Sequence, residues 1–161
     1  MALRQIRIEG DEILRKNARI VEEITPKIKE LVADMIETMY HANGVGLAAP
    51  QIGVLKRIVI IDVGEGPIVM INPEILKRSG EQEGIEGCLS VPGKSGIVKR
   101  PNYVKAQAVN LEGDVYTIEG EELLARAICH ELDHLNGQLY IDIAEEMVDY
   151  DQENDQEYDQ E

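Results

Sequence analysis

Only two stretches of this chain repeat their apolar residues with the period of an α-helix. The first covers residues 26–42 and starts at Thr25-Pro26, a capping residue followed by a proline that suits the first helical turn. The second begins near Gly120 and ends at Asn136-Gly137. The long segment between them instead has the β-branched, alternating pattern of strands, at residues 55–63, 68–71, 103–111 and 115–118.

This order of helix, strands and helix predicts a fold of the α+β class, because parallel sheets need helical connections between their strands. We expect antiparallel sheets packed around a central C-terminal helix, with one long N-terminal helix. The glycine-rich residues 80–96 are predicted to be irregular, and residues 138–143 are predicted to form a short strand.

Acidic residues are concentrated at the C-terminal end of the sequence. The net charge is −15, and residues 145–161 contain nine acidic residues and no basic one. We therefore expect a single catalytic domain over residues 1–145, followed by an acidic tail over residues 146–161. The negative charge also argues against a DNA partner or an anionic membrane surface.

The sequence gives no sign of an oxidising or membrane environment. Two cysteines cannot build a disulfide framework, and no apolar run approaches the length of a membrane span. The first residues contain no apolar segment typical of a secretory signal. We expect a cytoplasmic protein with reduced cysteines.

The sequence His130-Glu131-Leu132-Asp133-His134 is an HExxH motif inside the second helical segment. Its two histidines are four residues apart and share one helix face, where they can bind one divalent ion. Glu131 lies roughly 100° around the helix from His130, which suits a general base acting on water beside that ion. The alternative is a helix with two surface histidines.

A catalytic metal site needs a third protein ligand, and two residues compete for this role. Cys88 lies between Gly87 and Leu89, where glycine allows close approach of the backbone, and His41 ends the first helical segment. We expect the second cysteine, Cys129, to pack in the core. Gln51 could donate a hydrogen bond to a developing oxyanion, or could be an ordinary loop residue.

Three segments taken together resemble the peptide deformylase family. They are GVGLAAPQ at residues 44–51, EGCLS at 86–90 and HELDH at 130–134, in the order and with the separations of that family. The resemblance extends from about Ile6 to Ile143 and leaves out the acidic tail.

The resemblance implies a role for individual residues. Cys88, His130 and His134 would be the metal ligands, which favours Cys88 over His41, and Glu131 would be the acid and base. The oxyanion donors would be Gln51 and the backbone N–H of Leu89. The expected contacts to the extended substrate come from Val45, Gly46, Glu86 and Gly87.

The resemblance also implies an activity. Members remove the formyl group from the N-terminal formyl-methionine of new polypeptides, with Fe²⁺ as their usual metal and Zn²⁺, Ni²⁺ or Co²⁺ as substitutes in preparations. The expected partners are formylmethionyl nascent peptides and, transiently, the ribosome, and we expect a monomer. One alternative is an HExxH zinc endopeptidase, whose further ligand would come from the acidic tail. The other is a binding module that keeps the metal pocket without turnover.

Overall fold

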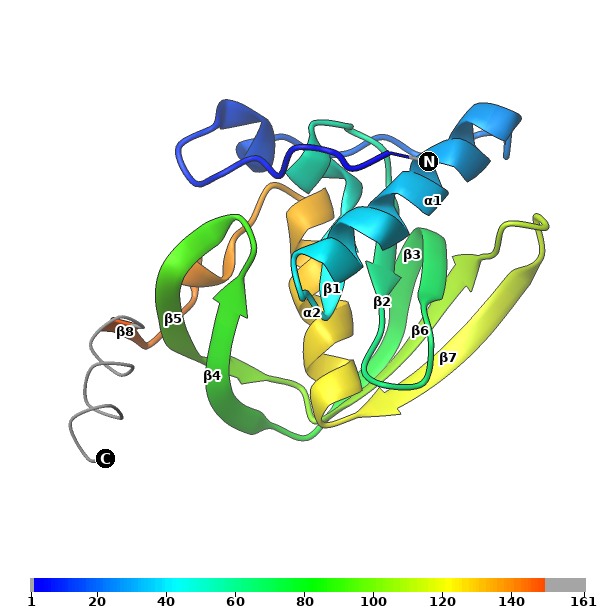
Figure 1. The fold of residues 1–161 in the computed structure, drawn as a ribbon. Coiled ribbons are helices and arrows are strands. Elements are labelled where there is room, and N and C mark those ends of the chain that lie inside the picture. The colour runs from blue at the N-terminus through cyan, green and yellow to red at the C-terminus, as the bar shows by residue number, and fades with distance from the viewer. Residues whose placement is uncertain (1, 150–161) are drawn as a thin grey trace.

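The computed structural model describes residues 2–149, which form two antiparallel sheets and two α-helices (Figure 1). The larger sheet has the strand order β1 (Gly46–Ala48), β2 (Ile58–Ile61), β3 (Ile68–Ser79), β6 (Tyr103–Val109), β7 (Val115–Glu121). The smaller sheet has the order β4 (Gln82–Cys88), β5 (Val91–Arg100), β8 (Glu146–Asp149). All the strand pairs are antiparallel, which confirms a mixed α and β fold with antiparallel sheets.

The two α-helices are α1 (Pro26–His41) and α2 (Leu123–Leu135). The Thr25 hydroxyl accepts a hydrogen bond from the Ile28 N–H at 3.2 Å and so caps the start of α1. Three short 3₁₀-helices complete the fold: η1 (Glu12–Arg15), η2 (Ala49–Ile52) and η3 (Tyr140–Asp142). No helix in the described part of the chain is long and apolar enough to cross a membrane.

Strand β2 is buried on both faces and separates two layers of the core. Its Val59 and Ile61 pack in one cluster with the apolar face of α2, whereas Ile58 and Ile60 pack in another cluster with α1. This division follows from the alternation of side chains along a strand. The larger sheet is therefore covered by α2 on one face and by α1 on the other.

Helix α2 lies in the middle of the molecule, with the larger sheet on one side and the smaller sheet on the other (Figure 1). Toward the larger sheet it presents apolar residues such as Ile128 and Leu132. Toward the smaller sheet it presents Arg126 and His130, which bond to residues of β4 and β5. A buried helix with a polar face needs partners for that face, and the smaller sheet supplies them.

The prediction that residues 80–96 are irregular is wrong. They form most of the hairpin β4–β5, whose strands are joined by the short turn at Leu89 and Ser90. Several of the glycines in this hairpin mark close packing within extended backbone. A Cβ on Gly96 would lie 3.0 Å from the Cβ of Ala144, and one on Gly84 would lie 3.0 Å from the Arg126 guanidinium.

The strand predicted at residues 138–143 is also wrong, because this segment forms the 3₁₀-helix η3. The Asp142 carboxylate accepts a hydrogen bond from the Leu139 N–H at 3.0 Å, a local contact that favours a turn. The first residues of the predicted tail are part of a sheet: residues 146–149 form β8, which pairs with Lys94–Ile97 of β5. The remaining tail residues, 150–161, lie outside the described residues.

Candidate metal centre

Three side chains converge between the smaller sheet and helix α2. The Cys88 sulfur and a ring nitrogen from each of His130 and His134 all lie within 4.8 Å of one another. His134 Nε2 lies 3.4 Å from the sulfur. Helix geometry places the two histidines on one face of α2, and Cys88 reaches them from the end of β4. Within residues 2–149, these three side chains form the group that could bind a metal ion.

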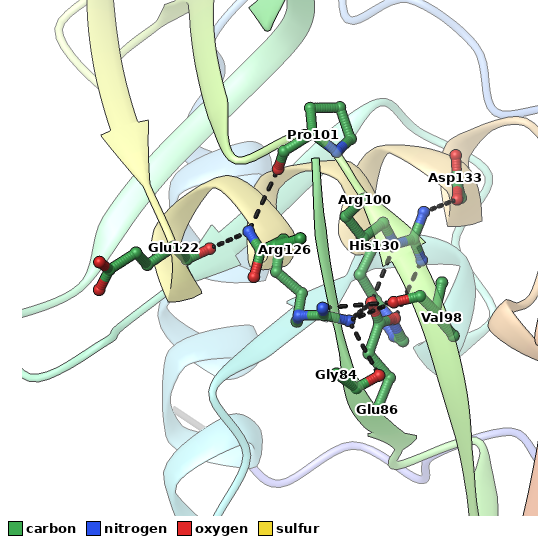
Figure 2. A network of polar contacts seen from close by, with 10 residues as sticks. Gly84, Glu86, Val98, Arg100, Pro101, Glu122, Arg126, His130 and Asp133 are labelled. Atoms are coloured by element: carbon green, nitrogen blue, oxygen red, sulfur yellow. Dashed lines mark hydrogen bonds and ion pairs between the residues drawn. The ribbon is translucent and has the colours of Figure 1, made fainter. Parts of the chain in front are cut away.

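A buried carboxylate orients the first histidine. Glu86 Oε1 accepts a hydrogen bond from the Nδ1–H of His130 at 2.7 Å, so that the other ring nitrogen is available to a metal. Arg100 donates to the same carboxylate through two nitrogens at 2.9 Å each, and Arg126 donates to it at 2.6 Å (Figure 2). Burial alone would raise the pKa of Glu86, but these bonds from Arg100 and His130 lower it to about 2.

The two histidines differ in their environments. Burial lowers the pKa of His134 well below its usual value, and nearby His130 adds to this effect, so His134 is a neutral imidazole. Burial also acts to lower the pKa of His130, but its contacts with Cys88 and Glu86 raise that pKa overall.

Glu131 is buried beside the three converging side chains without belonging to them. Its Oε1 has no hydrogen-bond partner among the described residues, and burial raises its pKa to about 7. The carboxyl group lies against Gly46 of β1, where an added Cβ would be 2.8 Å from the carboxyl carbon. A carboxyl group that changes its protonation near neutral pH is suited to transfer protons.

Two potential donors flank the cysteine. The side-chain oxygen of Gln51 accepts a hydrogen bond from the Ala48 N–H at 2.9 Å, which fixes the direction of the amide. Its NH₂ group then points toward Ser90 Oγ at 3.1 Å and the Cys88 sulfur at 3.6 Å. The N–H of Leu89, in the turn after β4, forms no hydrogen bond within residues 2–149.

A cleft of about 470 Å³ opens onto this centre. Its walls include every site residue predicted from the sequence except His134, which is buried. The four expected substrate contacts, Val45, Gly46, Glu86 and Gly87, all line it. Because the Glu86 carboxylate is bound by two arginines and a histidine, only the backbone of this residue can meet a peptide.

The structure separates the competing candidates for the third ligand. His41 is exposed at the end of α1 and is not part of the converging group, whereas Cys88 is. Cys129 is 5 % exposed and packs in the core cluster between α2 and the larger sheet, as predicted.

Sequence reasoning missed the two arginines that hold Glu86. Arg126 had a visible signal, since it is a lone cation in the otherwise apolar run from Leu123 to Cys129, four residues before His130. Arg100 had none, because its side-chain contact with Glu86 depends on the pairing of β4 with β5, in which Arg100 lies opposite Gln82. Ser90, whose Oγ accepts a hydrogen bond from the Gln51 amide, could be noticed only as part of the EGCLS segment.

Comparison with known proteins gives consistent matches along most of the chain. The profile of the family described as "Polypeptide deformylase" matches residues 3–149. A peptide deformylase of Agathobacter rectalis is 69% identical over 145 residues, which cover 90% of this chain and 92% of that protein. A peptide deformylase of Lachnoclostridium phytofermentans is 56% identical over 163 residues, covering 97% of this chain and 100% of that protein.

Solved structures agree with these matches. The crystal structure of a peptide deformylase from Thermotoga maritima superposes with a TM-score of 0.88 at 43% identity, covering 89% of this chain and 99% of that one. A peptide deformylase from Synechococcus elongatus, in complex with actinonin, superposes with a TM-score of 0.85 at 40% identity, covering 87% of this chain and 78% of that one.

Proposed function

The chain belongs to the peptide deformylase family, and on that premise we propose that Cys88, His130 and His134 hold its catalytic metal while Glu131 transfers the protons. Peptide deformylases are metalloenzymes of the hydrolase class. This chain accordingly removes the N-terminal formyl group from newly made polypeptides and releases formate.

The proposed ligands suit a divalent ion. A thiolate and two imidazoles accommodate Fe²⁺, Zn²⁺, Ni²⁺ and Co²⁺. His130 is oriented by the Glu86 carboxylate in the manner of metal-bound histidines, and the unpartnered oxygen of Glu131 lies beside the group. We propose Fe²⁺ as the resident ion, by analogy with the family. The bound ion supplies Lewis-acid chemistry, since it lowers the pKa of water and polarises a carbonyl oxygen.

Glu131 carries the proton transfers in this proposal. As the water oxygen forms a bond to the formyl carbon, Glu131 accepts a proton from that water. When the bond between the formyl carbon and the methionine nitrogen breaks, Glu131 returns the proton to the departing amine. The products are formic acid, which loses the second water proton to become formate, and a peptide with a free N-terminus, and Glu131 is again ionised. A pKa near 7 suits both steps.

The oxygen that becomes negative during the attack needs hydrogen-bond donors. We assign this role to the Gln51 amide and to the backbone N–H of Leu89, the residue that follows Cys88. Removal of one such donor typically lowers the rate by about 10²–10³-fold. The backbones of Val45, Gly46, Glu86 and Gly87 line the cleft where the peptide would extend.

Several broader properties belong to the same proposal. We propose that residues 1–149 form the catalytic unit, because β8 completes the smaller sheet. We also propose a monomeric enzyme in the cytoplasm that contacts the ribosome transiently, since its substrates are nascent chains. The alternative of a zinc endopeptidase is not favoured, because the family matches run through all three motifs of one deformylase pattern.

One experiment tests the metal set and the activity together. The protein is purified without oxygen, its metal content is measured, and formate release from formyl-Met-Ala is followed. We expect Cys88→Ala to lose metal and activity, whereas His41→Ala, which changes an exposed histidine outside the group, keeps both. The opposite pattern would show that the ligand assignment is wrong.

A further inference from the structure

The substrate cleft has an apolar mouth and one cationic wall. Val45, Ile85 and Leu123 line the cleft and are 42%, 59% and 51% exposed, so they form an apolar rim. Deeper in the same cleft lies Arg126, which is 8% exposed. A wall of this kind is unexpected for a cleft that receives an unmodified methionine, because a thioether is a poor hydrogen-bond acceptor.

The side chain of the first substrate residue has to lie in this cleft. This step rests on the proposed function, in which the formyl carbon reacts beside Cys88, His130 and His134. The methionine side chain begins only a few bonds from the formyl carbon, so we place it against the walls of the cleft. The walls therefore decide which side chains are accepted.

The hydrogen bonds of Arg126 leave part of its guanidinium group able to donate another hydrogen bond. Its acceptors are Glu86 Oε2 at 2.6 Å, Gly84 O at 3.4 Å and Val98 O at 3.3 Å, all on strands β4 and β5. The Nε–H of Arg126 forms no hydrogen bond to any described residue, and Figure 2 shows all of the drawn bonds on one side of the guanidinium.

The nearby carboxylate does not cancel this donor. Both oxygens of Glu86 are already bound, by Arg100, by Arg126 and by His130. The Asp133 carboxylate pairs with Arg100 at 2.7 Å and is not bonded to Arg126, so Glu86 is the carboxylate that Arg126 contacts. An oxygen at the tip of a substrate side chain would meet a donor here instead of a repelling acceptor.

We propose that Arg126 is a specificity-determining residue that lets this enzyme deformylate peptides whose first side chain ends in a hydrogen-bond acceptor on an apolar stem. Formyl-methionine sulfoxide is the test case, because it keeps the stem of methionine and adds one strongly accepting oxygen. The apolar rim holds the stem, and the Arg126 guanidinium donates to the added oxygen.

The experiment compares two substrates on the same enzyme. We measure kcat/KM for formyl-Met-Ala and for its sulfoxide form, and take the ratio of the two values. In Arg126→Met the ratio should move against the sulfoxide by about 10-fold, the loss of one charge-assisted hydrogen bond. In Arg126→Lys, which keeps a cationic donor, the ratio should recover in part.

Arg100→Met is the matched control. It also removes a guanidinium from Glu86, but Arg100 does not line this cleft. It should lower the rate with both substrates equally and leave the ratio unchanged. An unchanged ratio in Arg126→Met, or an equal change in Arg100→Met, would overturn the proposal. Failure of the unsubstituted enzyme to deformylate formyl-Met-Ala would instead refute the proposed function.

Discussion

Gly46 leaves room for the carboxyl group of Glu131, and filling that room should slow catalysis. An alanine Cβ at position 46 would lie 2.8 Å from the carboxyl carbon of Glu131 and 2.9 Å from its Cγ. Ordinary contacts between carbon atoms are about 3.5–4.0 Å, so the carboxyl group has to move by roughly 1 Å. The backbone at Gly46 needs no positive φ, and the substitution therefore tests the side-chain contact alone.

A displacement of this size should be costly for a proton-transfer group. A misplacement of about 1 Å can lower a rate by roughly 10²-fold, and we expect kcat of Gly46→Ala to fall by about that factor. Metal content should stay unchanged, because the atoms nearest to a Cβ at Gly46 belong to Glu131 and not to Cys88, His130 or His134. The assay is formate release from formyl-Met-Ala with metal analysis of the same sample.

A double-mutant cycle identifies the cause. In Glu131→Asp the shorter side chain withdraws the carboxyl group from Gly46, so adding Gly46→Ala to this background should cost far less than it does in the original chain. Equal losses in both backgrounds would show that the alanine blocks the substrate and not Glu131. A kcat within twofold of the original value would refute the contact altogether.

Three further predictions concern stability. The fold lowers the pKa of Glu86 to about 2, so the ionised carboxylate should contribute its full stabilisation above the ordinary pKa of 4.5 and lose it as the pH falls toward 2. The free energy of unfolding is measured by urea titration for the original chain and for Glu86→Gln. The difference between the two values should shrink from pH 4.5 to pH 2. Glu122 adopts a φ of 54°, which favours glycine, so Glu122→Gly should raise the unfolding free energy by about 1 kcal/mol. A chain ending at residue 149 should keep its melting temperature, whereas one ending at residue 145 should lose several degrees, because it lacks the pairing of β8 with β5.

Each of these three stability predictions would be contradicted by a specific result. A constant difference across the acid range would mean that Glu86 is not held as a carboxylate. Destabilisation by Glu122→Gly would mean that its side chain contributes more than its backbone strain costs. Equal melting temperatures for the two shortened chains would favour a catalytic domain that ends at residue 145.

The helices could be predicted from the sequence because their signals are local. Thr25-Pro26 starts α1 and Asn136-Gly137 follows α2, and the apolar period between such signals needs no knowledge of distant residues. The hairpin β4–β5 could not be predicted, because its glycines read as loop residues. They are there because Ala144, Arg126 and other distant residues pack against the strands, a tertiary effect that overrides local propensity.

The candidate site, like the fold, has one part that local sequence patterns predict and another part that depends on distant residues. Two histidines at helical spacing can be recognised in the sequence. The residues alone favoured Cys88 over His41 only weakly, and the resemblance to the family made the choice. The fold brings Cys88 to the histidines. The contacts of Glu86 were beyond reach, because Arg100 and Arg126 come from a different strand and from the helix. The roles assigned to these residues remain predictions that the variants above test.

The Glu86 network is better explained by positioning than by stability. Burying a carboxylate between two arginines costs desolvation energy that cancels much of the gain from the ion pairs, and apolar residues of similar size often stabilise a fold as well or better. Apolar residues, however, could not hold the Nδ1–H of His130 at 2.7 Å from an acceptor. The bonds from Arg100 keep Glu86 ionised, and Asp133 anchors Arg100 to α2 at 2.7 Å, so the acceptor stays fixed relative to the helix that carries the histidine. The polar face of a central, buried helix therefore exists because the metal centre requires it, and the smaller sheet makes that face compatible with folding.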